Sequence, residues 1–312
     1  MSLSLPKTPL LAGACLATAL AVAVGSAQAR TLDTAQGKLE VPDAPERVVT
    51  LYEGALDASL AAGVMPVGAV TTRGGDDVAR YLEAYLDEAR PAVVGVVREI
   101  NMEAVVGERP DVILAGPSLA DAQYALLSKI APTVVPQSPG VTPQAWKTEA
   151  RQYGQALGRE DAVNAAIDDV EARAAELAER VGVADIGATA NLVRWMPQGP
   201  LVMSDRLFSA GLLAAVGLEV DDAGLINGRG AHSDPLSLEN LSKLQGDWLF
   251  LATLNEEGEE ALVSAKDSPA FARLPVVEND RVVPVDGQLW TSANGPLAAE
   301  AILDDIEAAL VP

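Results

Sequence analysis

Two segments in opposite halves of the chain repeat one pattern, and this repeat restricts the fold more than any other feature of the sequence. In the first half, Glu103 opens a short helical stretch, and Asp111 stands eight positions later at the start of the apolar run Val-Ile-Leu-Ala. In the second half, Glu239 and Asp247 have the same spacing, and Trp-Leu-Phe-Leu follows. A shorter match, Leu-Ala-Ala, precedes each segment. Two matches in the same order predict two related lobes.

Short β-branched runs alternate with alanine-rich amphipathic stretches in both halves. In the first half, the pattern predicts strands at 47–51, 67–70, 92–94 and 111–115, and helices at 55–62, 77–88 and 102–107. The alternation resumes in the second half at 190–194, 207–216, 236–244, 248–253, 281–285 and 295–310. It predicts an α/β fold of two βα lobes with mainly parallel sheets. Ligands of such sheets bind at the carboxyl ends of strands, so we expect a ligand cleft between the lobes.

The longest helical stretch lies near the middle of the chain, from 144 to 181. Its apolar residues form one stripe at alternating spacings of four and three: Val163, Ile167, Val170, Ala174, Leu177 and Val181. A helix from 161 to 181 would be about 31 Å long, which is enough to join two lobes, although a surface helix of one domain has the same pattern. We predict a segment removed on export at 1–29, an N-terminal lobe at 30–157, a single joining helix at 158–181 and a C-terminal lobe at 182–312.

The first 29 residues are typical of a secretory signal peptide. Lys7 is their only charge, the apolar run 10–24 follows it, and Ala27-Gln28-Ala29 has the small-x-small pattern of a signal peptidase site. Fifteen apolar residues span only about 22 Å as a helix, against a hydrocarbon core of roughly 30 Å. We therefore expect an exported chain with no membrane insertion, whose mature form begins at Arg30.

The only cysteine, Cys15, lies inside this segment. A lipoprotein signal has Leu three positions before its cysteine, whereas this chain has Ala12. We expect a periplasmic protein without a lipid anchor. The mature chain would then have no cysteine, which excludes disulfides, thiol catalysis and thiolate metal sites.

The charge of the chain excludes two classes of partner. The chain has 22 Lys and Arg against 44 Asp and Glu, which gives a net charge of −22. Such a surface repels nucleic acids and anionic lipids.

The sequence resembles the periplasmic binding proteins that supply ferric siderophores, haem or cobalamin to ABC importers. The matching pieces are Arg47-Val48-Val49, Asn101-Met102-Glu103, Arg109-Pro110-Asp111, Ser237-Leu238-Glu239, Ser268-Pro269-Ala270-Phe271, and Trp290 followed by Gly295-Pro296-Leu297. The closing segment is similar to that of ferric citrate and hydroxamate binders. The resemblance implies two lobes joined by one rigid helix, with a ferric siderophore in the cleft between them.

The same resemblance implies partners and roles. Glu103 and Glu239 would each grip arginines of the ABC importer's permease subunits, one from each lobe. The protein would be a monomer with no cofactor of its own, and iron would enter only as part of the bound siderophore. Many members of the family have a ligand-binding arginine at the position of Val97. In this chain Arg98 follows Val97, and we put Arg98 forward as the ligand contact instead.

Aromatic and arginine side chains at strand ends are the candidate ligand contacts. Aromatic residues make up only 4% of the chain, and Tyr52, Trp195 and Trp290 follow or end predicted strands. Aromatic walls suit the apolar and flat parts of a siderophore. Trp146 and Trp248 are assigned to the core. The arginines that follow strands are Arg73, Arg98, Arg194 and Arg206, and guanidinium groups suit the oxygens of a ferric chelate.

Two alternatives compete with a siderophore binder. Haem or cobalamin would be a different cargo of the same family, and His232, the only histidine, would be the candidate axial ligand for haem. A single histidine disfavours a zinc or manganese site. A periplasmic hydrolase is the alternative from another class. The chain has no Gly-x-Ser-x-Gly motif and no cysteine after processing, so the predicted protein is not an enzyme.

Overall fold

The computed structural model describes residues 1, 29–86, 90–182, 187–226, 228 and 230–311. The apolar run predicted to be a signal peptide lies outside the described residues. Ala29, the last residue of the predicted signal, begins strand β1 (Ala29–Thr34), which pairs antiparallel with β2 (Gly37–Pro42). The sequence analysis did not predict this hairpin.

The first half of the chain folds around a six-stranded sheet. In spatial order its strands are β6 (Glu99–Ile100), β5 (Ala92–Val96), β4 (Gly68–Thr71), β3 (Val48–Thr50), β7 (Val112–Leu114) and β8 (Thr133–Val134). Every pairing is parallel except that of β5 with β6. The helices of this half are α1 (Glu53–Ala61), α2 (Met102–Gly107) and α3 (Asp121–Leu127).

The α-helix predicted at 77–88 is wrong. The structure has a 3₁₀ helix, η1 (Arg80–Tyr85), whose backbone bonds join residues three apart. Leu82 is its only buried side chain, so the segment has no continuous apolar face that could stabilise a longer helix.

The second half folds around a second sheet. Its strands are ordered β10 (Gly199–Val202), β9 (Thr189–Met196), β12 (Trp248–Thr253) and β13 (Val282–Asp286), and β11 (Glu219–Val220) also pairs with β9. Only the pairing of β10 with β9 is antiparallel. The helices are α6 (Phe208–Ala215), η3 (Leu238–Lys243), α7 (Glu256–Lys266), α8 (Pro269–Ala272), α9 (Pro275–Glu278), α10 (Gly287–Thr291) and α11 (Pro296–Leu310). Two βα lobes with mainly parallel sheets confirm the predicted fold.

The two aspartates of the sequence repeat have the same structural role. Asp111 stands directly before β7 and accepts hydrogen bonds from the backbone nitrogens of Glu46 (2.7 Å) and Arg47 (3.0 Å), just before β3. Asp247 stands directly before β12 and accepts one from the backbone nitrogen of Thr189 (2.9 Å), the first residue of β9. Because β7 pairs with β3 and β12 with β9, each aspartate joins the starts of two neighbouring parallel strands.

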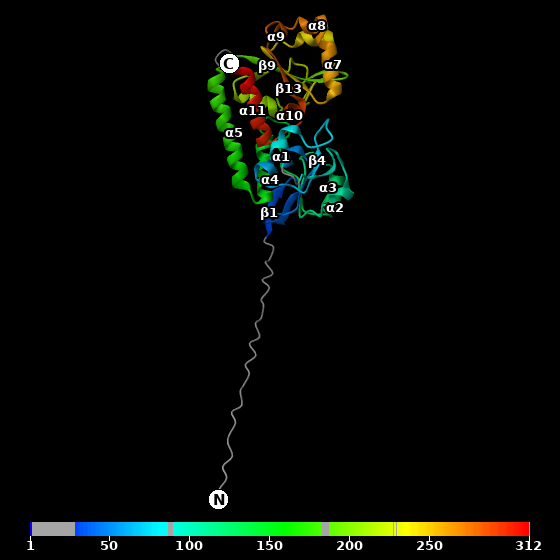
Figure 1. The fold of residues 1–312 in the computed structure, drawn as a ribbon, viewed down its shortest axis with the longest axis vertical. Helices are drawn as coiled ribbons and strands as arrows, with labels where there is room; N and C mark the ends of the chain where they lie inside the picture. The colour runs from blue at the N-terminus through cyan, green and yellow to red at the C-terminus, as the bar shows by residue number, and fades with distance from the viewer. Residues whose placement is uncertain (2–28, 87–89, 183–186, 227, 229, 312) are drawn as a thin grey trace.

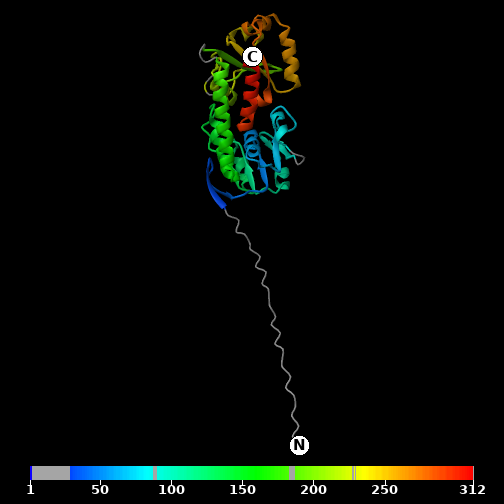
Figure 2. The same cartoon turned by 60° about the vertical axis from the view of Figure 1, so that its left-hand side comes forward.

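The long helical stretch contains two helices, α4 (Ala145–Leu157) and α5 (Glu160–Val181). The break falls at Gly158, whose backbone is left-handed (φ 67°) and where a Cβ would lie 2.5 Å from the carbonyl oxygen of Asp43. Five of the six residues of the predicted stripe, from Val163 to Leu177, are buried. The 22 residues of α5 span about 33 Å, and the helix runs along both lobes (Figures 1 and 2).

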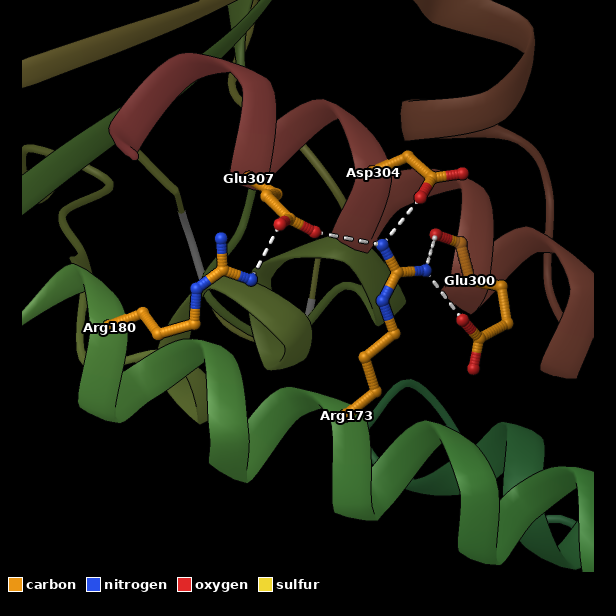
Figure 3. Close-up of polar contacts among 5 residues, drawn as sticks. All are labelled: Arg173, Arg180, Glu300, Asp304 and Glu307. Atoms are coloured by element: carbon orange, nitrogen blue, oxygen red, sulfur yellow. Dashed lines mark hydrogen bonds and ion pairs between the residues drawn. The ribbon is translucent and has the colours of Figure 1, made fainter. Parts of the chain in front are cut away.

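Ion pairs attach α5 to α11 (Figure 3). Arg173 on α5 contacts three carboxylates of α11: Glu300 (2.6 Å), Asp304 (2.5 Å) and Glu307 (3.2 Å). Arg180, two turns further along α5, pairs with Glu307 at 2.5 Å. Shared partners fix the arginines in place, so the cluster holds the long helix against the second lobe more firmly than one exposed pair could.

Candidate functional site

A cavity of about 440 Å³ lies between the lobes and is bounded by residues of both halves. The first half contributes Tyr52 at the end of β3, the segment 138–142 after β8, and the start of α4. The second half contributes 206–209 before α6 and 290–294 after β13. The cavity therefore lies at the carboxyl ends of parallel strands, where the fold class predicts a ligand.

A hydrogen-bonded group of polar side chains forms one wall of this cavity. The amide Nδ2 of Asn294 donates to the hydroxyl of Tyr52 (2.7 Å) and to Oε2 of Glu149 (3.1 Å). Ser138 donates to Oε1 of the same carboxylate at 2.7 Å. Burial raises the pKa of both Tyr52 and Glu149 above their usual ranges. Tyr52 and Arg206, both predicted from the sequence, thus border one cavity.

A second hollow, of about 350 Å³, lies at the carboxyl ends of β4 and β5. Two loops line it, 71–75 and 96–98, so the structure brings Arg73 and Arg98 together as predicted. Arg98 has a left-handed backbone (φ 79°), which is uncommon for a residue with a side chain and is often found at binding sites.

Glu53 holds the loop that carries Arg73. Its carboxylate accepts hydrogen bonds from the Thr72 hydroxyl (2.5 Å) and from the backbone nitrogen of Arg73 (2.9 Å). Burial raises the pKa of Glu53, and these two bonds oppose that rise. The sequence analysis missed Glu53, because an acidic residue in the first turn of a helix is ordinarily explained by the helix dipole alone.

Arg194 of β9 is a buried arginine of the second lobe. Its side chain is 95% buried, its Nη1 lies 3.5 Å from the Thr291 hydroxyl, and its Nε has no hydrogen-bond partner in the part of the chain that the structure describes. Burial lowers the pKa of Arg194, and the positive charge of Arg73 lowers it further. A buried guanidinium group with an unpaired Nε is suited to bind an anionic oxygen.

The structure contradicts one of the two predicted tryptophan contacts, Trp195. Trp195 is adjacent to Arg194 on one strand and therefore points to the opposite face of the sheet, where it packs edge-on against Phe271 with ring centroids 6.0 Å apart. Trp290 lies beside the cavity, but its ring is buried, is stacked on Phe250 at 4.9 Å and donates from Nε1 to Asp305 at 2.7 Å. Trp290 therefore borders the cavity as well as the core, whereas Trp195 lies in the core of the second lobe.

Trp146, which the sequence analysis assigned to the core, is part of the core and also lines the cavity. It is the second residue of α4 and packs edge-on against Phe208 of α6, with centroids 5.6 Å apart. Trp248 borders the core of the second lobe, as expected.

A buried carboxylate joins the two lobes beside the cleft. Asp57 on α1 accepts hydrogen bonds from the backbone nitrogens of Leu297 (3.0 Å) and Ala298 (2.8 Å) at the start of α11, and from the Tyr81 hydroxyl (3.0 Å). Gly295 precedes this helix with a φ of 130°, and a Cβ there would lie 2.3 Å from Asp57 Oδ1. Burial raises the pKa of Asp57 to about 7, while these three donors oppose the rise.

The remaining predicted residues lie on the surface. Glu103 is in the first turn of α2 and Glu239 is in the first turn of η3, one on each lobe, and both are exposed. His232 is also exposed and lines neither hollow. Within the described ranges, no group of three His, Cys, Asp or Glu side chains is placed to hold a metal ion. Among the helices of those ranges, none combines the length and the apolar character needed to cross a bilayer.

The two lobes, the long helix alongside them and the polar cleft at the strand ends define a solute-binding protein. Residues 48–289 match the family described as periplasmic binding protein, and the chain belongs to this family.

The chain is also similar to individual proteins. It is 28% identical to the probable siderophore-binding lipoprotein YfiY of Bacillus subtilis, over 91% of this chain and 88% of that protein. It is 25% identical to the Fe(3+) dicitrate-binding periplasmic protein FecB of Escherichia coli, over 92% of each. The structure of Staphylococcus aureus SirA complexed with staphyloferrin B superposes with a TM-score of 0.76 at 23% identity, covering 90% of this chain and 98% of SirA. This last similarity supports the fold.

Proposed function

We propose that the protein is the solute-binding subunit of an ABC importer, which captures a ferric siderophore and delivers it to the permease. The observation that carries the proposal is the cavity between the lobes, which has aromatic walls and is also lined by Arg206, together with the second hollow lined by Arg73 and Arg98. The relatives named for siderophore and ferric dicitrate binding support the same cargo.

The arginines explain how a strongly acidic protein can bind an anionic chelate. The surface charge is screened over about 8 Å at physiological ionic strength, whereas a charge-assisted bond in a partly dry cleft contributes about 1.5–3 kcal/mol. An oxygen placed between Arg73 and Arg194 would also relieve their mutual repulsion and give the Arg194 Nε a partner. The protein needs no cofactor and catalyses no reaction for this task, and iron arrives within the ligand.

The same proposal covers location and partners. Ala27-Gln28-Ala29 and the Ala12 that replaces the Leu of a lipoprotein signal support export to the periplasm without a lipid anchor. Glu103 and Glu239 are exposed on different lobes, which supports their docking to arginines of the permease. The subunit acts as a monomer.

A binding titration tests the cargo. Ferric citrate, a ferric hydroxamate, a ferric catecholate and haem are each added to the mature protein while tryptophan emission is followed. We expect a ferric siderophore to quench emission, because Trp146 lines the cavity, and the iron-free chelator to quench it less. Binding of haem but of no ferric siderophore, or of none of the four, would contradict the proposal.

Matched variants test the arginines. Arg73→Gln and Arg194→Gln each remove one cation from the cleft, and we expect affinity to fall about 10- to 100-fold. Arg273→Gln removes an exposed cation of the second lobe and serves as the control. Equal affinities for all three variants would show that the arginines do not hold the ligand.

A further inference from the structure

The cavity contains a buried carboxylate with no cationic partner. Glu149 on α4 lines the cavity and is 96% buried. Its two oxygens accept hydrogen bonds only from neutral groups, the Ser138 hydroxyl and the Asn294 amide, with Tyr52 beside them. The ion pairs of the described residues do not include Glu149. Buried charges are ordinarily paired, so this site lacks a cation.

Arg206 does not supply the cation that Glu149 lacks. It lines the same cavity, but its Nε donates to the carbonyl oxygen of Val141 at 3.2 Å. This bond connects the segment before α6 to the loop after β8, and no ion pair joins Arg206 to Glu149 among the described residues.

Hydrogen-bond acceptors are in excess on this wall. A carboxylate only accepts, so the Asn294 amide must present Nδ2 to Glu149, which fixes the orientation of the amide. Its Oδ1 is then left buried without a hydrogen bond, and so is the Ser292 hydroxyl, which also lines the cavity. A charged acceptor and an unpaired amide oxygen together need a ligand group with several donors.

Apolar side chains contribute much of the rest of the lining. Trp146 and Phe208 form an edge-to-face pair, and Val141, Leu207 and Ala293 add to it, together with hydroxyl side chains such as Thr142 and Ser209. Such walls suit a chain of methylene groups, because methylenes gain from leaving water and make no hydrogen bonds. A cavity that combines these apolar side chains with Glu149 and Asn294 is complementary to an alkylammonium group, which has three donors and one positive charge.

We propose that the cavity binds a protonated amine arm of the ligand, and that the protein is selective for ferric siderophores carrying a free amine. The ammonium group contacts Glu149 and Asn294 Oδ1, while the chelate lies toward Arg73 and Arg194. The inference rests on the proposed function and specifies the class of siderophore within it. The net charge of −22 favours the approach of such a cationic group.

The test uses a matched pair of ligands. The ferric chelate that binds most tightly among the citrate, hydroxamate and catecholate types is prepared with an aminopentyl arm, free or N-acetylated. For hydroxamates this pair is ferrioxamine B and its N-acetyl derivative. Acetylation removes the charge and two donors and leaves the iron centre unchanged. We expect the wild-type protein to bind the free amine at least about tenfold more tightly.

Variants test whether Glu149 causes the preference for the free amine. Glu149→Gln keeps the size of the side chain and its acceptor for Ser138, and we expect the two ligands to bind it about equally. Glu176→Gln removes an exposed charge of α5 and should retain the full wild-type preference. Equal binding of the pair by the wild type, or a preference that persists in Glu149→Gln, overturns the inference and leaves the proposed function standing. Binding of no ferric chelate at all overturns both.

Discussion

Removal of the Asp57 carboxylate should destabilise the whole molecule. In Asp57→Ala, the backbone nitrogens of Leu297 and Ala298 and the hydroxyl of Tyr81 all lose their acceptor at a site that is fully buried. An unpaired buried donor costs about 1–3 kcal/mol, and loss of a helix cap alone costs about 0.5–2 kcal/mol. Because one water molecule could satisfy only part of this set, we expect the free energy of unfolding to fall by about 3–5 kcal/mol.

Urea unfolding at pH 7, followed by far-UV circular dichroism, measures this loss. Tyr81→Phe removes only one of the three donors and should cost about 1 kcal/mol. Because Tyr81 and Asp57 share a hydrogen bond, the double variant should lose less than the two single losses added together. A loss below about 1 kcal/mol in Asp57→Ala, or one equal to that in Tyr81→Phe, would refute the capping argument.

Four further predictions follow from contacts described above. Burial raises the pKa of Asp57 to about 7, so the folded state binds the proton of this carboxyl group more tightly than the unfolded state does. The free energy of unfolding should therefore fall as the pH rises from about 4 to 7. Asp57→Asn should flatten this part of the pH profile. Gly295→Ala places a Cβ against Asp57 at a positive φ and should lower the thermal midpoint by several degrees, which calorimetry would detect. Arg173→Gln should lower the free energy of unfolding by about 1 kcal/mol in low salt and by less in 1 M NaCl, as urea titrations in the two buffers would show. Changing Glu103 and Glu239 together to Ala should leave siderophore binding intact and abolish iron uptake by cells, whereas normal uptake would remove their docking role.

The fold was predictable because the strands are short β-branched runs whose boundaries the sequence marks. The repeat around Asp111 and Asp247 was informative about the two lobes because it has a structural cause: each aspartate accepts a hydrogen bond from the start of the neighbouring strand. The sequence did not reveal the break between α4 and α5. The apolar stripe begins only at Val163, after the break, and the stretch before the break also has a helical pattern. Gly158 was the signal, but a glycine within a helical stretch does not always end it.

The site was predicted less completely. Strand geometry alone forbids Arg194 and Trp195 from facing the same cleft, so that error could have been avoided. Glu149 could not have been found, because an acidic residue in an amphipathic helix is usually solvated. Its burial depends on Tyr52 and on Asn294, which is 145 positions away. Contacts across such separations are set by the packing of the two lobes, on which local sequence patterns carry no information.

The bond between Asp57 and the start of α11 also orders the events of folding in time. The contact joins residues 240 positions apart, so until α11 is in place the Asp57 carboxylate keeps only one of its three donors, the Tyr81 hydroxyl. A polypeptide that emerges from the translocation channel amino end first cannot close this contact before its final residues arrive. A chain that stops short of α11 would expose the part of α1 that packs against this helix. Folding of the first lobe is therefore complete only once α11 has packed against α1.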